Sequence, residues 1–193
     1  MKLLLYCTKA KPYLIDFRNE MKNVKFDTFT NKEVLNTGWN ILNGKIVAEC
    51  DFEVEKIDFN SERFYENDKL NYRKELRKQK ELLKASCLGL FQIYFYLDKK
   101  GLGETNLNGY AIHIKNLHIF DKPRELKYYG YTDDKGHYHY ANAPQNMMRC
   151  YDYSGIDYIL ISIRPEWLVK ILNGEKTVDI RKKILKGMIK KWI

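Results

Sequence analysis

The sequence predicts an α+β fold in which short strands form a small β structure with helices beside it. Two strand patterns and two helix patterns carry this prediction. Apolar and polar residues alternate over 45–57, which is typical of a strand with one buried face. A short apolar, β-branched run at 158–163 is typical of a buried strand. Leucines and aromatic residues favour helices at 72–84 and 88–97.

Two further segments are predicted to form strands, and a third predicts no element. Leu3–Cys7 is a first strand, and 109–120 is predicted as a strand pair closed by Asp121-Lys122-Pro123. The segment 16–39 has no strong period and predicts no element. With 193 residues, of which 45% are hydrophobic, the chain is long enough for one well-buried domain and short for two full ones.

The segment 158–183 has the order strand, helix, turn, strand. Pro165 suits the first turn of a helix, and Asn173-Gly174 ends it, because glycine accepts the left-handed conformation. In the following strand, period 2 places Thr177, Asp179 and Arg181 on one face, with Lys176 at the strand entrance. Two interpretations remain open, an exposed face carrying a charge pair and a small polar pocket beside a helix end.

The run GEKTVDIR within this segment resembles the G-x-K-x-x-E-x-R signature of the ASCH family. Gly174, Lys176 and Arg181 match the signature, and Asp179 stands where the family usually has Glu. The preceding ISIRPEWLVKIL is also similar to the family's opening strand and helix. The resemblance implies a PUA-like (ASCH) small β-barrel with flanking helices.

Other segments resemble later parts of phage- and bacterium-type ASCH proteins, in rotated order. They are YCTKAKPYL, NGKIVAECDFEVEKI, GYAIHIKNLHIFDKPREL and APQNMMRCY. Each occurs once, so we predict that 1–193 is a single circularly permuted domain in which 158–183 supplies the family's opening strand–helix–strand. The alternative is a complete first domain followed by half of a second, which would leave open strand edges.

The resemblance also raises two enzymatic alternatives, and whether the chain is an enzyme stays open. One ASCH subgroup removes the acetyl group of N4-acetylcytidine, and it implies a Lys, a Thr three residues later and a Glu before the following helix. Lys176 matches the first, the second falls on Asp179, and the third falls near Lys84, with Glu81 the nearest carboxylate. The catalytic candidates are therefore Lys176 and Asp179.

Other ASCH proteins are metal-dependent ribonucleases, for which metal ligands would be required here. His137 and His139, with Asp133 and Asp134, are the residues that could be offered. In a loop rich in Gly, Asp and Tyr, a His-x-His pair more often belongs to a polar turn than to a metal site. We predict no metal and no cofactor.

Charge favours binding to RNA. The formal net charge is +9, and 164–193 contains nine Lys/Arg against three Asp/Glu, so this segment contributes +6. Seven tyrosines cluster just before it, and exposed rings beside cations suit unstacked bases of single-stranded RNA. We predict an RNA or nucleotide partner, with a phage-type modulator of a host nucleoprotein as an alternative. The predicted contacts are Lys9, Lys11, Lys176, Arg181, Lys182, Tyr138 and Tyr140.

The four cysteines are far apart and form no C-x-x-C motif, which favours reduced thiols in a cytoplasmic protein. No stretch has the length of a membrane-spanning helix, so we expect no membrane partner. The segment 184–193 places apolar residues on one helical face and lysines on the other. For it, a helix docked on the fold is favoured over a helix on a membrane surface.

Overall fold

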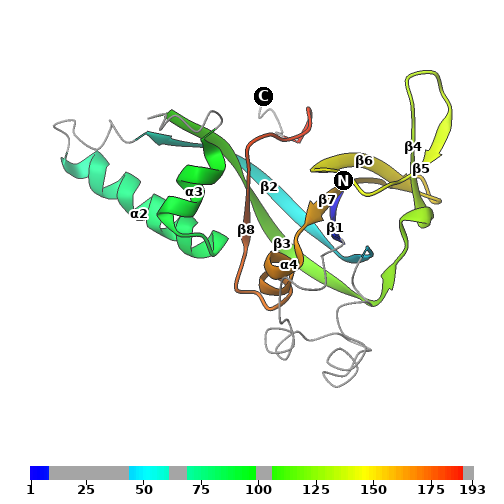
Figure 1. The fold of residues 1–193 in the computed structure, drawn as a ribbon, viewed down its shortest axis with the longest axis horizontal. Helices are drawn as coiled ribbons and strands as arrows, with labels where there is room; N and C mark the ends of the chain where they lie inside the picture. The colour runs from blue at the N-terminus through cyan, green and yellow to red at the C-terminus, as the bar shows by residue number, and fades with distance from the viewer. Residues whose placement is uncertain (9–43, 61–68, 99–105, 189–193) are drawn as a thin grey trace. The chain divides into compact units, whose positions relative to one another are not determined.

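A computed structural model describes residues 1–8, 44–60, 69–98 and 106–188 (Figure 1). The strands are β1 (Lys2–Cys7), β2 (Ile46–Asn60), β3 (Asn106–Arg124), β4 (Tyr129–Thr132), β5 (Tyr138–Tyr140), β6 (Met147–Asp152), β7 (Asp157–Ile163) and β8 (Val178–Arg181). The helices are α2 (Lys69–Ser86), α3 (Leu90–Leu97), α4 (Pro165–Leu172) and the short 3-10 helix η4 (Leu126–Tyr128). The segment 16–39, for which the sequence predicts no element, lies outside the described residues.

The strands form one mixed eight-stranded sheet in the order β5-β4-β6-β7-β1-β2-β3-β8. The fold is therefore a β-rich α+β fold. Both strands of the predicted C-terminal strand–helix–strand pair with earlier strands, β7 with β1 in parallel and β8 with β3 in antiparallel orientation. The chain divides into two compact units, unit 1 (1–52 and 115–174) and unit 2 (53–114 and 175–193), and β2 and β3 each contribute to both.

In unit 1, β1 is buried on both of its faces. It pairs with β7 from Lys2↔Tyr158 to Cys7↔Ile163 and with β2 on its other side. This position explains why its leucines are consecutive, since a central strand with both faces covered needs no polar alternation. One face packs into a cluster of buried residues comprising Leu4, Tyr6, Ile46, Phe120, Tyr129, Ala141, Cys150, Tyr158 and Leu160.

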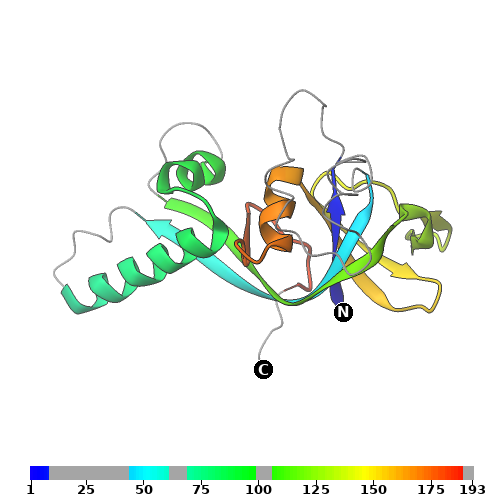
Figure 2. The ribbon, with the colours of Figure 1, turned by 90° about the horizontal axis from the view of Figure 1, so that it is seen from below.

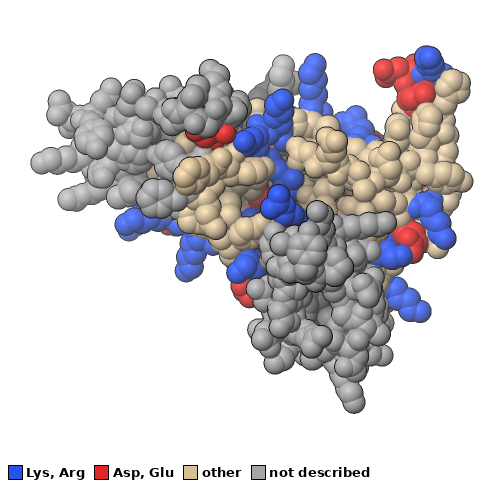
Figure 3. All heavy atoms as spheres, in the orientation of Figure 1, with Lys and Arg blue, Asp and Glu red and all other residues tan. Residues whose placement is uncertain are grey.

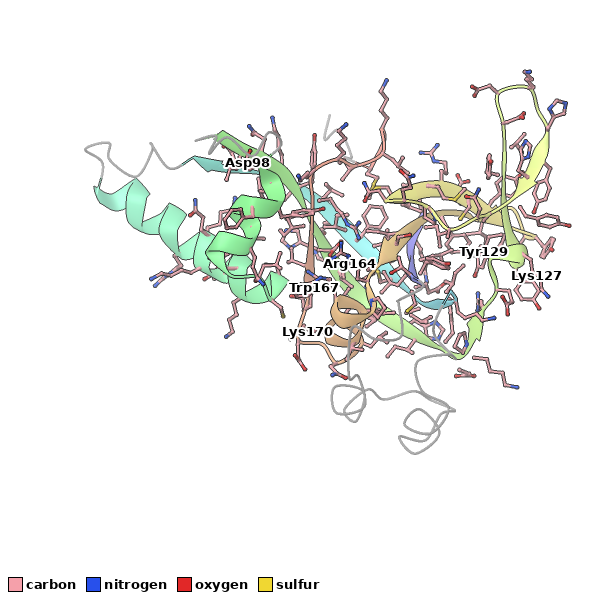
Figure 4. All side chains as sticks on the ribbon, in the orientation of Figure 1. Asp98, Lys127, Tyr129, Arg164, Trp167 and Lys170 are labelled. Atoms are coloured by element: carbon pink, nitrogen blue, oxygen red, sulfur yellow. The ribbon has the colours of Figure 1, made fainter. Side chains whose placement is uncertain are left out.

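Helix α4 packs on β1 and buries Leu168, Val169, Ile171 and Leu172. Its bounds confirm the sequence prediction. Pro165 occupies the first turn, and Gly174 follows the end of the helix with φ 76°. Figure 4 labels Arg164, which directly precedes α4, and Trp167 and Lys170 within the helix.

Unit 2 combines α2 and α3 with β8 and with parts of β2 and β3 (Figure 2). Its core comprises Ile57, Leu82, Ile93, Leu97, Leu107, Ala111, Val178 and Ile180. Strand β8 pairs with β3 from Tyr110↔Arg181 to His113↔Val178. Gly109 lets the end of α3 come close, because a Cβ there would lie 2.7 Å from Leu97 Cδ2.

Two sequence predictions were wrong. The segment 109–120 is not a strand pair but part of one long strand, β3, which continues through Asp121-Lys122-Pro123 to Arg124. Asn116 adopts φ 49°, but β3 continues through it without a reversal, and its Nδ2 donates to Asp51 Oδ2 at 2.8 Å. Residues 185–188 form a turn with Gly187 at φ 89° and not a helix, and 189–193 lie outside the described residues.

None of the described helices is long and apolar enough to cross a membrane.

Candidate nucleic-acid interface

Lys176 lies in unit 2 at the entrance to β8, and only 2% of it is exposed. Its Nζ donates to Ser86 O at 3.0 Å and to Val178 O at 2.7 Å, and it lies 3.4 Å from Asp179 Oδ1. Ser86 is the last residue of α2, so the ammonium caps the carbonyl end of this helix, where a cation is stabilising. Burial lowers the pKa of Lys176, and the neighbouring Asp179 carboxylate acts in the opposite direction.

Asp179 is held between two cations, Lys176 and Arg181. Arg181 Nε donates to Asp179 Oδ2 at 2.6 Å, and only 13% and 11% of the two side chains are exposed. Lys176, Asp179 and Arg181 therefore form a cluster of largely enclosed charges beside the end of α2, which we call the buried cluster. The predicted charge pair is present, but of the face that was predicted to be exposed Thr177 is exposed and Asp179 and Arg181 are not. Lys176 points into this cluster, and in this conformation its ammonium is not at the surface, where a phosphate could reach it.

Lys182 follows β8 and lies against α3. Its Nζ donates to Asp98 O at 3.3 Å and lies 5.5 Å from the centroid of the Tyr96 ring. On the same helix, Phe95 is 82% exposed and Tyr96 is 40% exposed. We did not identify these two aromatic residues from the sequence. The signal was the run Tyr94-Phe95-Tyr96, since three consecutive residues cannot all lie on the buried side of one helix.

Among the described residues of unit 1, four tyrosines are exposed, and we call them the tyrosine surface. They are Tyr128, Tyr138, Tyr140 and Tyr153, with 47%, 46%, 63% and 74% of each residue exposed. They belong to the η4–β4 junction, to β5 and to the turn after β6, and Figure 4 labels Lys127 and Tyr129 at that junction. The surface includes both tyrosines that the sequence analysis predicted to contact RNA.

Contacts within unit 1 fix the positions of several of these rings. The Tyr138 and Tyr140 rings meet edge to face, with centroids 5.5 Å apart. Tyr138 also lies over Gly130, where an added Cβ would clash with the Tyr138 hydroxyl oxygen. The Tyr153 hydroxyl donates to Lys127 O at 3.1 Å. These rings are therefore exposed and held in place at the same time.

Other tyrosines of the same sequence region are structural. Tyr129 is 1% exposed, and its hydroxyl accepts a hydrogen bond from Arg124 Nη1 at 3.1 Å. Tyr158 is 5% exposed and donates to Asp152 Oδ2 at 3.2 Å, and burial raises its pKa to about 12. The sequence region thus divides into core tyrosines and the exposed set.

Asp133 organises the loop between β4 and β5. Its carboxylate accepts from the backbone N of Lys135 at 3.0 Å and of His137 at 2.8 Å, and it lies 3.0 Å from His139 Nε2. These contacts lower the pKa of the Asp133 carboxyl, with the bond to His139 as the largest cause. Among the described residues there is no group of three or more His, Cys, Asp or Glu side chains that could hold a metal ion.

The charge of the chain is unequal between the units. Unit 2 contains 18 Lys/Arg and 12 Asp/Glu, which gives +6, and unit 1 contains 16 and 13, which gives +3. On the face drawn in Figure 3, blue Lys and Arg side chains are more prominent than red Asp and Glu side chains. Of the predicted cations, Arg181 and Lys182 lie in unit 2 and are half-buried, and Lys9 and Lys11 lie outside the described residues.

No family model, curated protein or solved structure matches the chain.

Proposed function

We propose that the protein binds single-stranded RNA, and the observation that carries this proposal is the tyrosine surface of unit 1. An exposed aromatic ring stacks on an unpaired base of any sequence, and each such contact contributes on the order of 1–3 kcal/mol. Rings that neighbouring groups already hold lose less conformational entropy on binding than mobile ones. Tyr138 over Gly130 and Tyr153 bonded to Lys127 O are held in this way.

The predicted phosphate contacts are Lys9, Lys11, Arg181 and Lys182, and they stay predictions. Arg181 is the last residue of β8 and Lys182 follows it, both in unit 2. Lys176 has a different role, because its ammonium is bonded to two backbone carbonyls. It supports β8, and β8 in turn positions the basic residues at its end.

The experiment measures binding of a fluorescent oligouridylate to the whole chain by anisotropy over a range of salt concentrations. Tyr140→Ala is expected to weaken binding by about 1–3 kcal/mol with an unchanged salt slope, and Tyr140→Phe is expected to retain most of the affinity. Ile156→Ala is a matched control, because Ile156 is a 51% exposed apolar residue of the same unit. If replacing Tyr140, Tyr138 or Tyr153 by Ala leaves the affinity for RNA unchanged in every case, the proposal is refuted.

The same proposal includes the family and the detailed fold, a circularly permuted ASCH-type domain with a PUA-like barrel. What supports it is the succession of β7, α4 and β8 around the GEKTVDIR run, with each of these strands paired to an earlier one. A crystal structure in which the sheet closes on itself would support the barrel. Two open sheet edges would refute it.

Hydrolysis of a modified nucleoside is a second candidate, and the observation that favours it is the Lys176–Asp179 pair. A buried lysine whose pKa is lowered is a common general base or nucleophile. Incubation with N4-acetylcytidine, followed by chromatography of the products, tests this candidate. Release of cytidine that disappears in Lys176→Met would support catalysis, and no release at high protein concentration would refute it for this substrate.

A further inference from the structure

We propose that the surface formed by Phe95, Tyr96 and Lys182 is a second binding site for single-stranded nucleic acid, made of residues of unit 2 alone. The inference rests on the proposed function and extends it, because it gives unit 2 its own base-stacking groups. The sequence analysis assigned only Lys182 to nucleic acid, through its charge. The aromatic partners come from the structure.

The first observation is the exposure of α3. Ile93 and Leu97 are 0% and 1% exposed and pack into the core of unit 2, so the helix is firmly seated. Phe95 lies between them in sequence and is 82% exposed. A phenylalanine this exposed contributes little to folding, since most of its apolar area remains in water. Its planar ring is available for stacking.

The second observation is the position of Lys182 beside the neighbouring ring. Its Nζ is 5.5 Å from the Tyr96 centroid and donates to Asp98 O at 3.3 Å. Asp98, labelled in Figure 4, directly follows the last residue of α3, so the lysine lies at the carbonyl end of the helix, which favours a cation. The cation is thereby held next to an exposed aromatic ring.

The third observation is charge. In 175–188, the described part of the C-terminal segment, the exposed Lys183 and Lys186 accompany Lys182, whereas Lys176 and Arg181 contact Asp179. An apolar protein surface would not offer negative charge to the cations that surround these rings. A single strand presents planar bases and phosphates in alternation, which match an aromatic pair beside a lysine. Charge complementarity therefore selects nucleic acid as the occupant.

The test uses the whole chain and a single-stranded oligouridylate that carries 5-iodouridine. After irradiation, the crosslinked peptides are identified by mass spectrometry. Crosslinks are expected in the peptide that contains Phe95 and Tyr96, in addition to peptides from 128–153. Crosslinks confined to 128–153 would overturn the second site and leave the proposed function intact. The absence of any RNA binding would overturn both.

Two variants measure the contributions of the ring and the cation. Phe95→Ala is expected to weaken binding roughly 5- to 150-fold without changing the salt slope. Lys182→Gln is expected to lower the slope of log affinity against log salt by about 0.7, the value for one phosphate contact on a single strand. Ile156→Ala in unit 1 is the matched control for loss of an exposed apolar side chain. If Phe95→Ala and Lys182→Gln both bind like the wild type while Tyr140→Ala binds weakly, the second site is refuted alone.

Discussion

Replacing Lys176 by methionine tests whether a buried ammonium holds α2 and β8 together. Methionine keeps the length and the apolar stem of the side chain but removes the donors to Ser86 O, at 3.0 Å, and Val178 O, at 2.7 Å. It also removes the Lys176–Asp179 ion pair and leaves the Arg181–Asp179 ion pair in place. Removal of one member of a buried ion pair destabilises a protein by about 3–5 kcal/mol.

Two effects reduce this magnitude. Arg181 still neutralises Asp179, and the energy needed to bury the ammonium is regained when the charge is removed. We therefore expect Lys176→Met to lower the free energy of unfolding by about 3 kcal/mol, the lower end of that range. A typical domain has only about 5–15 kcal/mol in total, so the change is large.

Urea unfolding followed by circular dichroism measures the loss. Lys186→Met is the matched control, because Lys186 is exposed in the same segment and should change stability by no more than about 0.5 kcal/mol. Asp179→Asn and the double variant complete a double-mutant cycle. The stability lost in the double variant should be smaller than the sum of the losses in the two single variants by about 0.5–3 kcal/mol. A loss below about 1 kcal/mol for Lys176→Met, or strict additivity, would refute the buried pair.

The same variant distinguishes support from direct contact with RNA. Because the ammonium is enclosed, Lys176→Met should leave the salt slope of RNA binding unchanged under conditions in which the protein stays folded. A slope lowered by about 0.7 would instead show that Lys176 contacts a phosphate, as the charge pattern of the sequence suggested.

Three further predictions concern backbone strain, ring position and pH. Cys87→Gly should raise the free energy of unfolding by about 1 kcal/mol, because the cysteine after α2 has φ 55°, and lower stability in urea would show that the thiol contributes more than the strain. Gly130→Ala should push the Tyr138 ring from its place and weaken RNA binding at constant salt slope, whereas unchanged affinity would mean that bases do not stack on Tyr138. Burial raises the pKa of Cys50 from 9.0 to about 12, so the folded state keeps a proton that the unfolded chain loses in this interval. Stability should therefore fall between pH 9 and 12 by up to about 1.4 kcal/mol per pH unit for this thiol, and a Cys50→Ala variant with an equally steep fall would contradict the assignment.

The buried cluster also explains how a basic segment is displayed. The net positive charge after β8 needs a fixed attachment if its cations are to act at defined positions. Asp179 binds Arg181 at 2.6 Å, and the same strand is anchored through Lys176 to the end of α2. A short β8 is thus connected to a helix and to β3 before the basic residues begin.

Elements whose signals are local could be predicted from the sequence. Pro165 and Gly174 set the ends of α4, because each acts through its own backbone dihedral angles. Alternation predicted β2, and period 2 predicted that Asp179 and Arg181 would share a face of the strand, where they form an ion pair. The excess of Lys and Arg near the C-terminus is likewise a property of composition alone.

Which of these groups are exposed could not be predicted from local patterns, because it depends on how distant segments pack. Ser86 O, the partner of Lys176, lies 90 residues away in sequence, and no local pattern places the end of α2 over the entrance to β8. Tyr129 and Tyr140 are chemically identical, yet one is 1% and the other 63% exposed, because the first packs in the core of unit 1 and the second lies on the short strand β5 at the end of the sheet order. Burial depends on which distant strands meet, and that depends on long-range packing free energy, which the local pattern of a sequence does not contain.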